Sequence, residues 1–130
     1  MEKIFETIDS KIQNLEQELK RIKILRERTI EEAKNNELYK EKYFYRYDRS
    51  QKKGVMDIYY HVIYADNIIN DNQLKFIGDS IIKTNTDSLE YSFSTGNLVL
   101  PVTDVNEISK EEYENILNES LDYITRKFKE

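Results

Sequence analysis

The sequence predicts an α+β fold, in which a long N-terminal α-helix precedes an antiparallel β-sheet of four to five strands and a C-terminal α-helix closes the chain. Apolar residues recur at helical spacing near both ends of the chain and alternate with period two in the middle. The three glycines and the single proline all lie between the two helical segments, so neither segment is interrupted by a helix breaker. At 130 residues there is room for one domain, so residues 1–130 are expected to form a single domain.

The first predicted element is a helix over residues 1–36. Its apolar residues follow steps of four and three, the pattern of a coiled coil or a helical hairpin: Ile8, Ile12, Leu15, Leu19 and Ile22. Good helix formers fill the positions between them. This stripe is longer than a small sheet can cover, so we expect another helix to contact it, from a partner, from a second copy of the chain or from residues 109–128 of the same chain.

The sheet is expected over residues 41–104. Tyr43, Tyr45 and Tyr47 alternate with other side chains, as in a strand, and a turn at 50–54 leads into alternating residues over 55–65. We expect Met56, Ile58, Tyr60, Val62 and Tyr64 to share one face. A polar loop should follow at 66–72. Two further strands, 89–93 and 98–102, are predicted on either side of a turn at 94–97, and Pro101 places the second at a sheet edge or bulge.

Residues 73–84 allow two interpretations. Leu74, Ile77 and Ile81 fit a short helix, whereas Gly78 and Asp79 between apolar pairs fit a tight hairpin of two strands. The strand interpretation is favoured. If the segment were helical, the order of elements would resemble that of type III secretion chaperones.

The closing helix is predicted over residues 109–128. Ser109 and Glu112 form a capping box, and Ile108 and Tyr113 form the accompanying hydrophobic staple. One apolar face is expected to contain Tyr113, Ile116, Leu117, Leu121, Ile124 and Phe128. Acidic residues occupy the first turn and basic residues the last, as the helix dipole favours.

Composition excludes several classes of protein. There is no cysteine, so neither disulfides nor thiolate chemistry is available. No apolar stretch is long enough for a membrane span, and the N-terminus lacks the apolar core of a signal peptide. We therefore expect a cytoplasmic protein that does not contact a membrane.

Catalytic chemistry is thinly represented. The single histidine, His61, could act as a general base, but a half-buried strand histidine bonded to its neighbours is the simpler interpretation. Asp66, Asn70 and Asp71 miss the spacing of a calcium loop, and the isolated glycines form no phosphate loop. We expect neither an enzyme nor a bound metal or cofactor.

A basic and aromatic segment is the main candidate binding surface. Its residues combine cations that attract phosphate with rings that stack on unpaired bases: Lys20, Arg21, Lys23, Arg26, Arg28, Lys40, Lys42, Tyr43, Tyr45, Arg46, Tyr47, Arg49, Lys52 and Lys53. RNA contact over residues 20–53 is one interpretation. The other is a solvated helix beside a sheet whose tyrosines pack on each other.

The rest of the chain is acidic. Residues 54–130 contain 6 basic and 14 acidic side chains, whereas residues 1–53 contain 14 basic and 11 acidic ones. An acidic surface can imitate nucleic acid and occupy a basic groove, although it often only maintains solubility.

The residue usage indicates an AT-rich genome, because Ile, Asn, Lys and Tyr are abundant while Ala, Gly and Pro are scarce. In size, acidity, codon bias and lack of catalytic residues, the chain is similar to the anti-CRISPR inhibitors of phages and mobile elements. This resemblance implies a non-catalytic protein that docks on and inhibits a larger nucleoprotein complex. The alternatives are a cytosolic chaperone or adaptor that binds a protein segment, and a small RNA-binding protein.

Overall fold

The computed structural model describes residues 2–50, 54–70, 72–85 and 88–129. It confirms the α+β class, with two helices and one five-stranded antiparallel sheet. The chain divides into two compact units, Met1–Lys34 and Asn35–Glu130. The first consists of most of α1, and the second contains the sheet and α2.

Helix α1 spans Glu2–Tyr39, close to the predicted 1–36. The hydroxyls of Thr7 and Thr29 donate to the carbonyls of Lys3 and Leu25, one turn earlier, so these two residues are accommodated within the helix. The five side chains of the predicted apolar stripe are between 46 and 64% exposed. Within its own unit, the helix therefore leaves this stripe exposed.

The last turn of α1 belongs to the second unit and is tied to strand β2. The Asn36 side chain accepts from the Ala65 amide at 2.8 Å and donates to the Ala65 carbonyl at 2.7 Å. Asn35 is buried and donates to the Asp66 carbonyl. These two asparagines satisfy backbone groups that the irregular part of β2 leaves without a strand partner.

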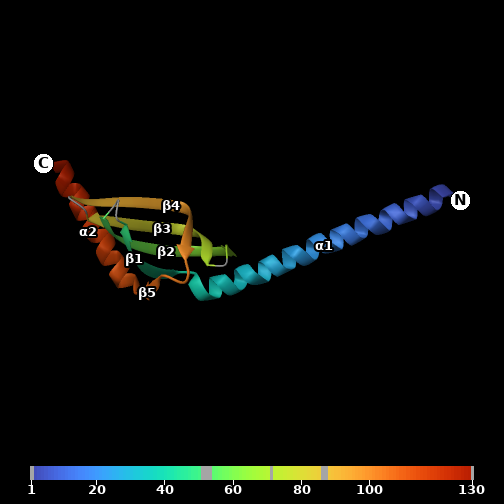
Figure 1. Ribbon diagram of the computed structural model, residues 1–130, viewed down its shortest axis with the longest axis horizontal. Helices are drawn as coiled ribbons and strands as arrows, with labels where there is room; N and C mark the ends of the chain where they lie inside the picture. The colour runs from blue at the N-terminus through green and yellow to red at the C-terminus, as the bar shows by residue number, and fades with distance from the viewer. Residues whose placement is uncertain (1, 51–53, 71, 86–87, 130) are drawn as a thin grey trace. The chain divides into compact units, whose positions relative to one another are not determined.

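The strands lie in the order β4-β3-β2-β1-β5, with every neighbouring pair antiparallel (Figure 1). Their bounds are β1 Lys42–Ser50, β2 Gly54–Ile69, β3 Gln73–Asn85, β4 Leu89–Pro101 and β5 Asn106–Ile108. The predicted hairpin of β1 and β2 is confirmed, and Gly54 begins β2 with a positive φ of 78°. Residues 51–53 of the predicted turn lie outside the described residues. Pro101 lies in an edge strand, as predicted.

The apolar core lies on one face of the sheet. Phe44, Tyr60, Val62, Phe76 and Leu100 are buried there. The short segment 102–105 joins β4 to β5, which are the two opposite edges of the sheet. So short a connection requires the sheet to curl around its core.

A bulge in β2 corrects one predicted face. The register shifts between Val62 and Tyr64, so Ala65 becomes fully buried while Tyr64 becomes exposed. One extra residue reverses the alternation beyond it. Met56, Ile58, Tyr60 and Val62 share a face as predicted, but Tyr64 does not.

Strands β3 and β4 also correct the predicted turns. Each is continuous, so neither Gly78–Asp79 nor residues 94–97 form a turn, and the two strands pair without a register shift. Gly78 and Gly96 lie opposite each other, with Gly96 at a φ of 107° inside its strand. A side chain at Gly78 would collide with the His61 carbonyl oxygen. The predicted polar loop at 66–72 is shorter too, because β2 continues to Ile69.

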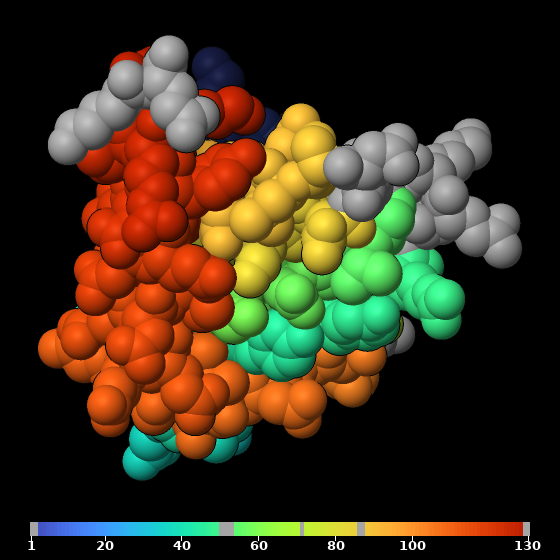
Figure 2. Space-filling view, turned by 90° about the vertical axis from the view of Figure 1, so that its left-hand side faces the viewer, coloured from blue at the N-terminus to red at the C-terminus, as the bar shows by residue number. Residues whose placement is uncertain are grey.

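Helix α2 spans Lys110–Lys129 and crosses the other face of the sheet. The Glu112 amide donates to the Ser109 hydroxyl at 3.1 Å, so the predicted N-cap is confirmed. Tyr113 and Ser120 are buried, whereas Leu121 and Phe128 are 50 and 88% exposed. The predicted apolar face was therefore wrong at Leu121 and Phe128. The small Ser120 faces the sheet in place of Leu121, and Phe128 lies exposed in the last turn of α2. Figure 2 shows the red and orange surface of α2 lying against the green and yellow surface of the strands.

Within the described parts of the chain, no helix is long and apolar enough to cross a membrane.

Candidate functional site

A row of four side chains crosses the sheet on the face that α2 covers. Tyr43 on β1 is paired with His61 on β2, His61 with Asp79 on β3, and Asp79 with Thr95 on β4. Residues paired across antiparallel strands point to the same face, so the register brings the four side chains together. Ile81 and Phe93, also paired, lie next to this row.

The first two turns of α2 lie over this row. Tyr113 is in ring contact with Tyr43 at 5.1 Å between centroids and with His61 at 5.8 Å. Glu114 and Leu117 come from the same part of the helix. The Ser109 cap fixes where the helix begins, and with it the positions of these three side chains.

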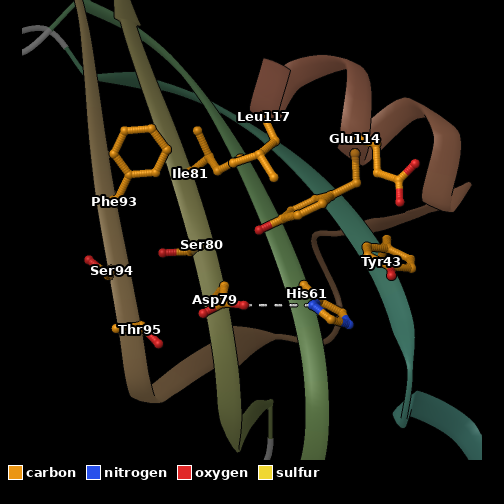
Figure 3. A pocket seen from close by; sticks show the side chains of 11 residues that line it. Tyr43, His61, Asp79, Ser80, Ile81, Phe93, Ser94, Thr95, Glu114 and Leu117 are labelled. Carbon is orange, nitrogen blue, oxygen red and sulfur yellow. Dashed lines mark ion pairs between the residues drawn. The ribbon is translucent and has the colours of Figure 1, made fainter. Parts of the chain in front are cut away.

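Between the helix and the sheet lies a cavity of about 420 Å³ (Figure 3). We call it the α2 cavity. It is lined by Tyr43, His61, Asp79, Ser80, Ile81, Phe93, Ser94, Thr95, Tyr113, Glu114 and Leu117. Its walls combine aromatic and aliphatic surface with two carboxylates, and the size is within the range of small-ligand pockets.

His61 is held in the cavity by ring contacts. Its ring stacks on Tyr43 at 4.4 Å with an interplanar angle of 12°. Its nitrogens lie 3.7 Å from an Asp79 oxygen and 3.9 Å from a Glu41 oxygen, which is too far for hydrogen bonds. Among the described residues, Nε2 is buried without a hydrogen-bond partner. The predicted half-burial of His61 is confirmed, but the expected hydrogen bonding is not found at Nε2.

Tyr113 contributes a neutral phenol. Burial raises its pKa to about 12, and the charge of Asp79 and the neighbouring Tyr43 add to the rise. Its hydroxyl therefore keeps its proton at neutral pH.

The cavity has the features of a site for an organic cation. The carboxylates of Asp79 and Glu114 supply negative charge, and the faces of aromatic rings attract cations. Ile81, Phe93 and Leu117 supply apolar surface for an aliphatic stem. Among the described residues that line the cavity, none is a lysine or an arginine.

A neighbouring cluster on the same face holds a cation supplied by the chain itself. The Lys83 ammonium donates to Glu119 of α2 at 3.1 Å and lies 5.9 Å from the centre of the Tyr91 ring. Burial lowers the pKa of Lys83, but the hydrogen bond to Glu119 and the proximity of Tyr91 outweigh it, and the pKa is raised. A ring from the sheet and a glutamate from α2 thus bind an ammonium group here.

No metal centre is found in the part of the chain that the structure describes, since no group of three or more histidine, aspartate or glutamate side chains could hold an ion.

The predicted basic and aromatic residues are dispersed over different surfaces. Of those that the structure describes, only Tyr43 lines the α2 cavity. Tyr45 packs on Tyr59 and donates to Asp57 at 2.6 Å, whereas Tyr47 is exposed. The three tyrosines share a strand face as predicted, but they differ in burial and contacts.

The cations of the hairpin are also divided. Lys42 pairs with Glu107 at 3.3 Å. Arg46 lies on the opposite face from Tyr43 and pairs with Asp104 at 3.2 Å. Lys40 and Arg49 are exposed, and Lys52 and Lys53 lie outside the described residues. The helical set is exposed along α1: Lys20, Arg21, Lys23, Arg26 and Arg28. RNA binding by these residues stays a prediction.

The sequence interpretation missed the other principal residues of the cavity, among them Asp79, Phe93, Thr95 and Glu114. The alternation of Tyr91, Phe93 and Thr95 is a usable signal for these positions, but the predicted turn at 94–97 interrupts it. Comparison with protein-family models, curated proteins and solved structures finds no match to this chain.

Proposed function

We propose that this protein is a non-catalytic binding protein that docks on a basic surface of a larger protein or nucleoprotein complex. In this proposal the α2 cavity takes up an arginine or lysine side chain of the partner. The observation that carries it is the pairing of aromatic walls with the Asp79 and Glu114 carboxylates, in a cavity that no lysine or arginine of the described chain lines.

The chemistry of a long basic side chain matches that of the cavity. Its methylene groups would pack on Ile81, Phe93 and Leu117, while its charged head would reach Asp79 and Glu114. The Lys83 cluster supports this assignment, because the same face already binds an ammonium with a tyrosine ring and a glutamate.

The acidity of the chain after residue 53 supports a basic partner. Excess negative charge accelerates association with a positive surface and discriminates against acidic ones. Basic grooves are where proteins hold nucleic acid. Docking there would exclude the nucleic acid, so we propose inhibition as the biological effect.

The test uses butylguanidine as a mimic of the arginine side chain and butylurea as its neutral counterpart. NMR titration of the full-length chain should shift the signals of His61, Thr95 and Leu117 with butylguanidine only. Asp79→Asn should weaken this binding about tenfold, because a hydrogen bond between charged groups is lost. The matched control is Glu111→Gln, an exposed acid on α2 that does not line the cavity.

A second arm identifies the source of the cation. An arginine-containing peptide should bind more tightly than butylguanidine, and the same peptide with citrulline should not bind. Equal shifts with butylurea, or unchanged affinity in Asp79→Asn, would contradict the cation site. If butylguanidine binds tightly and the peptide binds no more tightly, the ligand of the cavity is a small guanidinium compound and not a protein.

A further inference from the structure

The exposed stripe of α1 has the regular spacing of a heptad repeat. Phe5, Ile12 and Leu19 occupy the position called a, and Ile8, Leu15 and Ile22 the position called d. These side chains are 46 to 64% exposed. An amphipathic helix gains stability by burying such a seam against another helix, and a/d spacing together with charges at positions e and g is typical of a coiled coil.

The charges beside the seam identify the partner. In a parallel coiled coil, a residue at position g lies near the residue five positions later on the other helix, at position e. Two copies of α1 in register would place Lys11 near Glu16 of the second copy and Glu18 near Lys23 of the second copy. Each pair occurs twice by symmetry, so the dimer has four attractive contacts of this kind.

The next pair of positions g and e is apolar on both helices. Leu25 would lie near Ile30 of the second copy, and both side chains are exposed in the single chain. We therefore propose that two copies of this protein associate through a parallel coiled coil of their α1 helices. The inference is independent of the α2 cavity and of the proposed function.

An antiparallel pair of the same helices fits less well. If the two seams overlap fully, Ile12 lies opposite Leu15 of the second copy. Each residue at position e then lies near a position e of the second copy, and each residue at position g near a position g. Lys11 would then lie near Glu18 of the second copy, but Asp9 would lie near Glu16. Between residues 9 and 18, the two repulsive contacts cancel the two attractive ones. In the parallel pair, the charged contacts between positions 11 and 23 are all attractive.

Arg26 favours two strands over three. It occupies position a, where a charged residue interrupts the apolar seam and fixes the register at a cost in stability. Its long side chain can reach water at the edge of a two-stranded coil. In a coil of more strands, position a is more enclosed, and the burial of several guanidinium groups would be costly.

Sedimentation equilibrium on the full-length chain should give a concentration-dependent mass that approaches two chains. Glu16→Lys places lysine near Lys11 of the second copy and should raise the dissociation constant about tenfold, because two attractive contacts become repulsive. Adding Lys11→Glu in the same chain restores opposite charges and should restore association. Glu27→Lys is the matched control, since position b faces away from the seam.

Orientation can be tested with a single thiol, because the chain has no cysteine. In a parallel dimer, Ile8→Cys places the two sulfurs together and should give a disulfide-linked dimer on mild oxidation. In the antiparallel register the two positions would be about 16 Å apart, too far for a disulfide. Ser10→Cys, on the outer face at position f, is the control and should remain unlinked.

A mass of one chain at every concentration would overturn the proposal, as would a mass of three or more chains. Tighter association of Glu16→Lys would show the antiparallel arrangement instead, because that change relieves the contact with Asp9. Failure of Ile8→Cys to form a disulfide while the mass stays at two chains would also reject the parallel arrangement.

Discussion

At the residue scale, tyrosine determines much of the chemistry of the sheet. Burial raises the pKa of Tyr45, Tyr59, Tyr60 and Tyr91, and in Tyr45 the hydrogen bond to Asp57 adds to the rise. Tyr113 is the most clearly placed of these groups, since it is buried between the sheet and α2 and its pKa is raised to about 12. A phenol that ionises less readily in the folded state than in the unfolded state makes the free energy of unfolding fall at alkaline pH.

Tyr113→Phe should reduce the alkaline sensitivity of the fold. Between pH 10 and 12 the phenol is ionised in the unfolded chain and protonated in the folded one, so the unfolded state binds fewer protons. The contribution is complete below pH 10 and is lost as pH rises to about 12. A shift of two pH units corresponds to about 3 kcal/mol at most.

Urea unfolding at pH 9 and pH 11 measures this effect. The parent protein should lose more stability between the two values than Tyr113→Phe does. Tyr47→Phe, at an exposed position on the same sheet face as Tyr43, is the control and should keep the slope of the parent. Equal slopes for the parent and Tyr113→Phe would show that the buried phenol is not linked to folding.

At the element scale, local signals predicted the two helices and the first hairpin. Their evidence lies within a few residues: the Ser109 cap, the uninterrupted helix formers of α1, and Gly54, where β2 begins. The turn at 94–97 was predicted on equally local grounds and was wrong, because pairing along the whole of β3 holds β4 extended through Gly96. The cavity depends on strand register and on the placement of α2, so Tyr43 alone among its residues was predicted as a binding residue.

The face that α2 presents to the sheet can be tested by exchanging two neighbouring positions. Ser120 is fully buried, and a larger side chain there would push the helix away from the strands. Ser120→Leu should therefore lower the free energy of unfolding by about 1 to 3 kcal/mol. Leu121→Ser alters a half-exposed side chain and should cost less than about 1 kcal/mol.

Thermal or urea unfolding of the two variants distinguishes the observed face from the one expected from apolar spacing. If Leu121→Ser were the more destabilising change, α2 would present Leu121 to the sheet and the observed packing would be incorrect.

At the scale of the whole molecule, the two compact units have different roles in these proposals. The unit Asn35–Glu130 contains the α2 cavity, and the unit Met1–Lys34 contains the apolar seam. A dimer formed through the seam would carry two cavities. Simultaneous contact with two basic side chains of one partner would then raise the overall affinity without any new contact in either site.

The last turn of α1 marks where the second unit begins, and truncation tests this. A chain of residues 35–130 keeps Asn35 and Asn36, whose side chains satisfy the backbone of Ala65 and Asp66. At a protein concentration where neither chain is associated, it should unfold at the same urea concentration as the full-length protein. It should also retain butylguanidine binding, but it should no longer associate. A chain of residues 41–130 loses these hydrogen bonds and the packing of Tyr39 on Phe44, which together should cost several kcal/mol. Equal stability of the two truncated chains would show that the asparagines are dispensable. Continued association of the 35–130 chain would locate the contact between copies outside the seam.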